Sequence, residues 1–94
     1  MNKTILIEII GAPIWCSDGV KETWREVADW ARGQLVARFG DAVQVRYYNL
    51  FDIDCPPIPA DAQLPFIFVN KEIFSSGGKI SLPKLRQHVD ELLF

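Results

Sequence analysis

Cysteine and histidine are scarce in this chain, and their scarcity excludes several classes of protein. Only two cysteines, Cys16 and Cys55, occur among 94 residues, and His88 is the single histidine. Small secreted domains that are held together by disulfides are much richer in cysteine than this. A closed zinc site needs four cysteine, histidine or acidic ligands at characteristic spacings. His88 has no cysteine or second histidine at such a spacing. We therefore expect neither a disulfide scaffold nor a metal site.

Excess charge and long apolar runs are also absent. The formal net charge is −2, and no basic patch of the kind that binds nucleic acid stands out. No run approaches the ~20 apolar residues that cross a bilayer. The apolar stretch 5–10 contains Glu8 and is not followed by a small-residue cleavage site, unlike a signal peptide. We expect one domain over residues 1–94, cytoplasmic, with free or transiently oxidised thiols and with no nucleic acid or membrane among its partners.

Short apolar runs in the first half of the chain predict a strand, a helix and a second strand. Residues 5–10 are almost continuously apolar and β-branched, which is typical of a strand covered on both faces. Apolar residues at steps of three and four predict a helix over 20–39, capped by Ser17 or Asp18. Val43, Val45 and Tyr47 alternate with polar neighbours, so we expect the next strand over residues 43–51. Such a βαβ unit makes the two strands parallel.

The second half predicts a connector, a hairpin and a helix. Residues 52–63 include three prolines within four positions, which excludes a full helix there. Residues 64–79 predict a hairpin that turns at Asn70-Lys71, and Ser81 caps a closing helix with apolar residues along one face. The order β-α-β, connector, β-β-α predicts an α/β fold with a mixed four-stranded sheet and two main helices.

Cys16 occupies a position where a thiol can be activated. It follows the first strand and precedes the predicted helix, whose unpaired N–H groups and dipole would favour the thiolate. Open α/β sheets bind ligands beyond the carboxyl ends of their parallel strands, which is where Cys16 lies. Trp15 beside it offers a flat apolar platform for a partner. The alternative is an inert Cys16 next to a Trp15 that belongs to the core.

Cys55 lies four residues past the end of the second strand. Neighbouring parallel strands are about 4.8 Å apart and end at the same edge of their sheet. A disulfide needs Cα atoms about 4.4–6.8 Å apart, which a short loop can provide. Cys55 is therefore a candidate to resolve Cys16, and the alternative is that it is an ordinary loop thiol.

The order of elements and several local sequences resemble the thioredoxin-like superfamily. The dipeptide WC sits between the first strand and the first helix, and residues 64–93 look like a thioredoxin C-terminal half with its proline, hairpin, glycine and amphipathic helix. The resemblance implies that Pro65 follows a cis peptide bond and faces the reactive cysteine. It also implies that the backbone of Leu64 pairs with an extended substrate segment.

A closer resemblance is to the small bacterial YuzD-type family of disulfide oxidoreductases. The shared pieces are an early GA, a cysteine, KET, VRY followed by an apolar residue and FD, and the proline hairpin. Both families usually carry C-x-x-C, whereas this chain has CSDG, with Gly19 at the place of the second cysteine. It also has three residues fewer before KET than the YuzD type. Cys16 therefore lacks the usual partner.

These observations predict a thioredoxin-like thiol–disulfide oxidoreductase that acts on a protein or small-molecule disulfide or thiol. Cys16 would be the nucleophile and Cys55 the resolving thiol, with no bound cofactor and with glutathione as the resolving thiol if Cys55 does not serve. The substrate would be held by Trp15, Ser17, Leu64 and Pro65. One alternative is a redox-inactive thioredoxin-fold module that binds a protein or peptide. Another is a metal or iron–sulfur carrier that uses Cys16.

Overall fold

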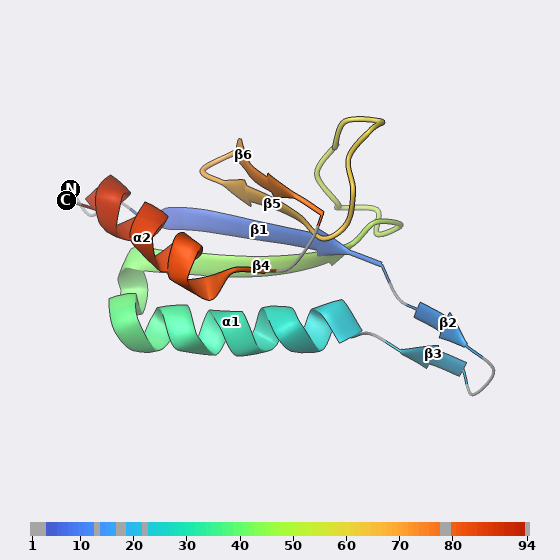
Figure 1. The fold of residues 1–94 in the computed structure, drawn as a ribbon, viewed down its shortest axis with the longest axis horizontal. Helices are drawn as coiled ribbons and strands as arrows, with labels where there is room; N and C mark the ends of the chain where they lie inside the picture. The colour runs from blue at the N-terminus through green and yellow to red at the C-terminus, as the bar shows by residue number, and fades with distance from the viewer. Residues whose placement is uncertain (1–3, 13, 17–18, 22, 78–79, 94) are drawn as a thin grey trace.

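The computed structural model describes residues 4–12, 14–16, 19–21, 23–77 and 80–93. Strands and helices follow one another along the chain as shown in Figure 1. In order they are β1 (Ile5–Gly11), β2 (Ile14–Cys16), β3 (Gly19–Lys21), α1 (Thr23–Phe39), a 3₁₀ turn η1 (Gly40–Ala42), β4 (Val43–Asn49), β5 (Phe66–Val69), β6 (Glu72–Ser76) and α2 (Leu82–Leu93).

Four of the strands form a mixed sheet, as the sequence predicts, and their order across the sheet is β4-β1-β5-β6. β1 and β4 run parallel in an unbroken register from Ile5 opposite Val43 to Gly11 opposite Asn49. β5 runs antiparallel to β1, and β6 pairs with β5 through a hairpin. Asn70 and Lys71 form its turn with φ values of 52° and 68°, which confirms the predicted hairpin.

Alternate residues of β1 face two different layers. Ile5, Ile7 and Ile9 pack against α1 and α2, which both cover this face of the sheet. Glu8 and Ile10 point to the opposite face, where the connector between β4 and β5 packs in place of a helix. The central position of β1 between these layers explains why its run of apolar residues is almost continuous.

The first helix begins later than the sequence predicts. α1 starts at Thr23, and residues 14–16 and 19–21 pair as the separate two-stranded hairpin β2–β3, so residues 20 and 21 lie on a strand and not in the first helical turn. Gly19 adopts a φ of 118°, a left-handed conformation that suits a tight hairpin turn and not a helix. The prediction that Ser17 or Asp18 caps this helix is therefore wrong, and both residues lie outside the described ranges.

The helices are otherwise placed as predicted. In α1, Ala31 and Leu35 of the predicted apolar stripe are fully buried against the sheet. The Ser81 carbonyl accepts the first intrahelical hydrogen bond of α2 from Leu85 N at 3.0 Å, so Ser81 occupies the N-cap position. Within the described ranges, no helix combines the length and apolar character that crossing a membrane requires.

Candidate functional site

The carboxyl ends of β1 and β4 bring several predicted site segments to one edge of the sheet. Gly11 ends β1 opposite Asn49 of β4, and Leu50 N donates a hydrogen bond to Gly11 O at 2.8 Å. The chain continues from β1 into the hairpin that carries Cys16, and from β4 into the connector that carries Cys55. The prediction that both cysteines follow strand ends at the same edge is confirmed.

The third segment at this edge is the proline turn before β5. Phe66 pairs with Ile10, so Pro65 lies beside the end of β1. The Leu64–Pro65 peptide bond is cis, as the resemblance to thioredoxins implies. Pro65 is buried, and its carbonyl accepts a hydrogen bond from Gly77 N at 2.9 Å. This bond extends the pairing of β5 and β6 by one step and fixes the turn at the sheet edge.

Cys16 lies on a strand and not at a helix N-terminus. It ends β2 opposite Gly19 at the turn of the hairpin, whereas Ile14 and Lys21 pair at the hairpin's base. The hairpin extends past the end of the four-stranded sheet in Figure 1. Because a helix dipole acts only within the first turn, α1 does not activate Cys16, and that part of the prediction is wrong. The side chains of Trp15 and Cys16, and all of Ser17, fall outside what the structure describes.

Gly11 allows the start of α1 to pack directly on the end of β1. A Cβ atom at Gly11 would lie 2.7 Å from Trp24 Cβ and 2.7 Å from Tyr47 Oη, closer than van der Waals contact permits. The absence of a side chain therefore lets the helix and β4 close around the point where the hairpin leaves the sheet.

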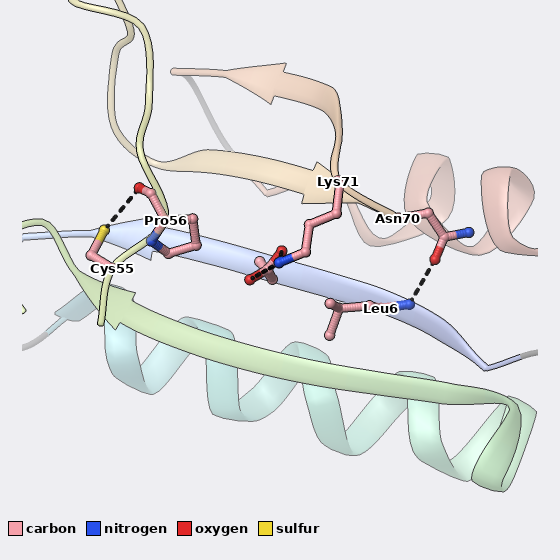
Figure 2. A network of polar contacts seen from close by, with 6 residues as sticks. Leu6, Cys55, Pro56, Asn70 and Lys71 are labelled. Atoms are coloured by element: carbon pink, nitrogen blue, oxygen red, sulfur yellow. Dashed lines mark hydrogen bonds and ion pairs between the residues drawn. The ribbon is translucent and has the colours of Figure 1, made fainter. Parts of the chain in front are cut away.

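Cys55 is held in a sequence of tight turns after β4. Its N–H donates to Asp52 O at 3.1 Å, while the Asp52 carboxylate accepts from Asn49 N at 2.9 Å. The half-buried thiol donates a weak hydrogen bond to Pro56 O at 3.5 Å (Figure 2). Burial, followed by the carboxylates of Asp52, Asp54 and Glu8, raises the pKa of the Cys55 thiol above its ordinary value.

Glu8 is a buried carboxylate on the same face of the sheet. Its exposed fraction is 1%, because β1 is a central strand and the connector covers this face. Lys71 Nζ lies 3.0 Å from Glu8 Oε1 and 3.2 Å from Oε2, reaching in from the β5–β6 turn. A hollow of about 200 Å³ adjoins this ion pair and is lined also by Pro56, Pro57 and Phe68.

The sequence analysis missed the Glu8–Lys71 pair. A charged residue within the apolar run 5–10 was the available signal, because such a run indicates a strand with both faces covered. Finding the partner requires the hairpin turn to fold back over β1. Asn70 fixes this turn, since its Oδ1 accepts a hydrogen bond from Leu6 N at 3.0 Å and its N–H donates to Leu6 O at 2.8 Å.

The arrangement supplies thiol-bearing segments and a cis-proline turn at one edge of the sheet. Within the ranges that the structure describes, no three His, Cys, Asp or Glu side chains gather closely enough to hold a metal ion. Cys55 is a free thiol. Its pairing with Cys16 stays a prediction.

Comparisons with known proteins identify a similar fold but indicate no activity. No family model matches the chain, and no curated protein matches it. A crystal structure of a protein of unknown function, SA0789 from Staphylococcus aureus, has a similar fold with a TM-score of 0.63 and 19% sequence identity. The similarity covers 97% of this chain and 93% of that one. A small α/β fold of this kind therefore occurs in a second natural protein.

Proposed function

We propose that the protein is a thioredoxin-like thiol–disulfide exchange protein in which Cys16 attacks the substrate and Cys55 resolves it. One observation carries the proposal: the hairpin with Cys16, the connector with Cys55 and the cis-Pro65 turn all leave the same edge of the sheet. The strand order β4-β1-β5-β6 is compatible with the fold that the resemblance implies.

The exchange needs no group beyond the two thiols and a disulfide substrate. The Cys16 thiolate attacks one sulfur of the substrate disulfide, so a mixed disulfide forms and one substrate thiolate leaves. The Cys55 thiolate then attacks the Cys16 sulfur and releases the second substrate thiolate. The substrate is reduced by two electrons, and the protein is oxidised to a Cys16–Cys55 disulfide.

The environment of Cys55 supports the assignment of roles. Only the thiolate is nucleophilic, and the raised pKa keeps Cys55 mostly protonated near neutral pH. Cys55 is thus a poor first nucleophile. Once a mixed disulfide on Cys16 is near, proximity offsets the small thiolate fraction. Cys16, on a hairpin that extends from the sheet, is the better placed of the two to meet a substrate.

The proposal is tested by exposing the reduced protein to bis(2-hydroxyethyl) disulfide and then measuring intact mass and a peptide map. We expect the wild-type protein to lose two hydrogens and to yield a peptide that links Cys16 to Cys55. Cys55→Ser should trap the mixed disulfide on Cys16, whereas Cys16→Ser should react much more slowly. If neither thiol reacts while circular dichroism shows a folded protein, the redox function is refuted.

A binding module is the second candidate, and an exposed apolar pair favours it. Phe51 is 81% exposed, and Ile53 is fully exposed, although both follow β4 at the edge described above. Apolar side chains held in water by hydrogen-bonded turns are typical of an interaction surface. In that case Cys16→Ser/Cys55→Ser should bind a partner as well as the wild type does, whereas Phe51→Ser/Ile53→Ser should not.

A further inference from the structure

Two exposed arginines lie beside the outer edge of β4. Arg32 belongs to α1 and Arg46 to β4. Both line two adjoining hollows of about 390 and 500 Å³, and Val45 of β4 is the third residue that the two hollows share. α1 packs along β4, so these three residues gather where the helix passes the strand (Figure 1). We call this place the arginine notch.

The positive charge of the arginine notch is not neutralised within the described part of the chain. Neither Arg32 nor Arg46 forms an ion pair with a described residue. No carboxylate is among the described residues that line the hollow nearer the start of β4. The other hollow contains Asp29 and Asp54, but it also contains a third arginine, Arg25. Positive groups therefore outnumber negative ones in both hollows.

The guanidinium of Arg46 is oriented by a neutral neighbour. The Gln44 amide, with its oxygen toward Arg46, accepts hydrogen bonds from Arg46 Nη2 at 2.8 Å and from Nε at 3.0 Å. An amide oxygen fixes the position of the side chain without cancelling its charge. Arg46 can thus contact an anion through Nη1, whose N–H groups these bonds do not use.

The backbone of β4 adds one more donor to the arginine notch. Val43 N–H turns away from β1 and donates to Gly40 O. Asn49 N–H, at the other end of the strand, donates to the Asp52 carboxylate at 2.9 Å. Because alternate residues of a strand share a direction, Val45 N–H also points outward, and no described group accepts from it. Both ends of the edge are occupied, so the edge suits a compact ligand at Val45 and not an added strand.

The donors and charges of the arginine notch match a compact dianion. Two guanidinium groups supply two positive charges, and a phosphate monoester carries close to two negative charges near neutral pH. Arginine binds phosphate oxygens through paired N–H donors, and backbone N–H groups at a sheet edge contribute to anion sites. A carboxylate or a nucleic-acid phosphodiester has a single negative charge, so it would leave one of the two arginines without a counter-charge.

We propose that the arginine notch binds a phosphate monoester. Its oxygens accept hydrogen bonds from the guanidinium groups of Arg32 and Arg46 and from Val45 N–H. A phosphorylated side chain of another protein and a small phosphate metabolite both carry this group, and binding measurements distinguish them. The arginine notch shares no residue with the cysteine segments or the proline turn, so the site is independent of the thiol chemistry proposed above.

The test is a titration of the reduced wild-type protein with methyl phosphate, followed by amide NMR. At about pH 7.5 most of this probe is the dianion. We expect saturable binding with a dissociation constant of about 1 mM or tighter, and a downfield shift of the Val45 amide proton as it forms a hydrogen bond. Methyl sulfate has the same tetrahedral shape but one negative charge, so it should bind at least about fivefold more weakly.

Matched variants separate specific contacts from general charge. Arg32→Gln and Arg46→Gln should each weaken methyl phosphate binding about fivefold, because each leaves the phosphate with a single guanidinium. Arg38→Gln removes an equal charge from α1, but Arg38 lines neither hollow and pairs with Asp90 at 3.3 Å. This control should bind within about twofold of the wild type. Circular dichroism shows whether each variant is folded.

An end-blocked glycine–phosphoserine–glycine peptide identifies the source of the phosphate. If it binds at least as tightly as methyl phosphate, the natural ligand is a phosphorylated segment of another protein. If methyl phosphate binds and the peptide does not, the ligand is a small phosphate metabolite.

Four results would overturn the proposal. The first is no binding of methyl phosphate at about tenfold the expected dissociation constant. The second is equal binding of methyl sulfate, and the third is undiminished binding by folded Arg32→Gln and Arg46→Gln. The fourth is a set of amide shifts that spares residues 43–47, which would place the phosphate elsewhere.

Discussion

At the scale of single residues, Cys55 differs from a free cysteine because of what surrounds it. It is half-buried against the apolar cluster around Phe66, and acidic residues flank it along the connector. Both effects penalise the thiolate, so they act on reactivity in the same direction. The chemistry of this thiol is therefore set by the fold and not by its nearest sequence neighbours alone.

We predict that Cys55 reacts with iodoacetamide along a pH profile shifted upward from that of a free cysteine. In Cys16→Ser, the alkylation rate should be half-maximal above about pH 8.5, the ordinary pKa of a cysteine thiol. Asp52→Asn should shift the midpoint downward, because it removes a negative charge and keeps an oxygen for the Asn49 N–H. Mass spectrometry of quenched samples gives the rates. A midpoint at or below that of N-acetylcysteine amide would contradict the prediction.

The Glu8–Lys71 pair makes a second residue-scale prediction. Lys71→Met keeps the aliphatic stem but leaves the buried Glu8 carboxylate without its cation, so we expect a loss of about 1–3 kcal/mol in the free energy of unfolding. The range is modest because the Lys71 side chain is largely exposed. Urea denaturation measures the loss.

A control variant isolates the interaction between the two charges. In a Glu8→Gln background, the same Lys71→Met change should cost much less, because no buried charge is then left unpaired. Equal losses in both backgrounds would show that Lys71 stabilises the turn itself and not Glu8.

At the scale of elements, the close packing of α1 on the end of β1 depends on Gly11. We predict that Gly11→Ala lowers the free energy of unfolding by about 1–3 kcal/mol, since its Cβ would clash with Trp24 and Tyr47. Gly33→Ala is the matched control within α1, where a Cβ meets nothing within 4 Å. It should stabilise the protein by about 0.5–1 kcal/mol through helix propensity. Thermal and urea unfolding measure the free energy of unfolding of both variants. Equal changes in the two variants would refute the steric argument.

The positions of the two helices show where sequence patterns predict an element correctly and where they do not. Apolar spacing located the body of α1 and all of α2, because a face of Ala31 and Leu35 or of Leu85 and Val89 must be buried. It misplaced the start of α1, because Val20 fits the helical spacing and yet lies on β3. Positive φ at Gly19 is the deciding feature, and glycine alone does not reveal which conformation it adopts.

At the scale of the whole molecule, the exposed surface divides into two regions with different chemistry. The carboxyl edge of β1 and β4 carries the cysteine segments and the cis-Pro65 turn, while the outer side of β4 carries arginines over apolar residues.

The sequence by itself determined the order of the main strands and helices, the parallel strands, the turn at Asn70 and the edge to which both cysteine segments belong. These features follow from local propensity and from the geometry of βαβ units, which act over short stretches of chain. Only the tertiary structure decided the burial of Glu8, its pairing with Lys71, and the separation of Cys16 from the helix start. Each of these depends on contacts between segments that are far apart in the sequence. Such contacts produce no periodic pattern of residues from which they could be predicted.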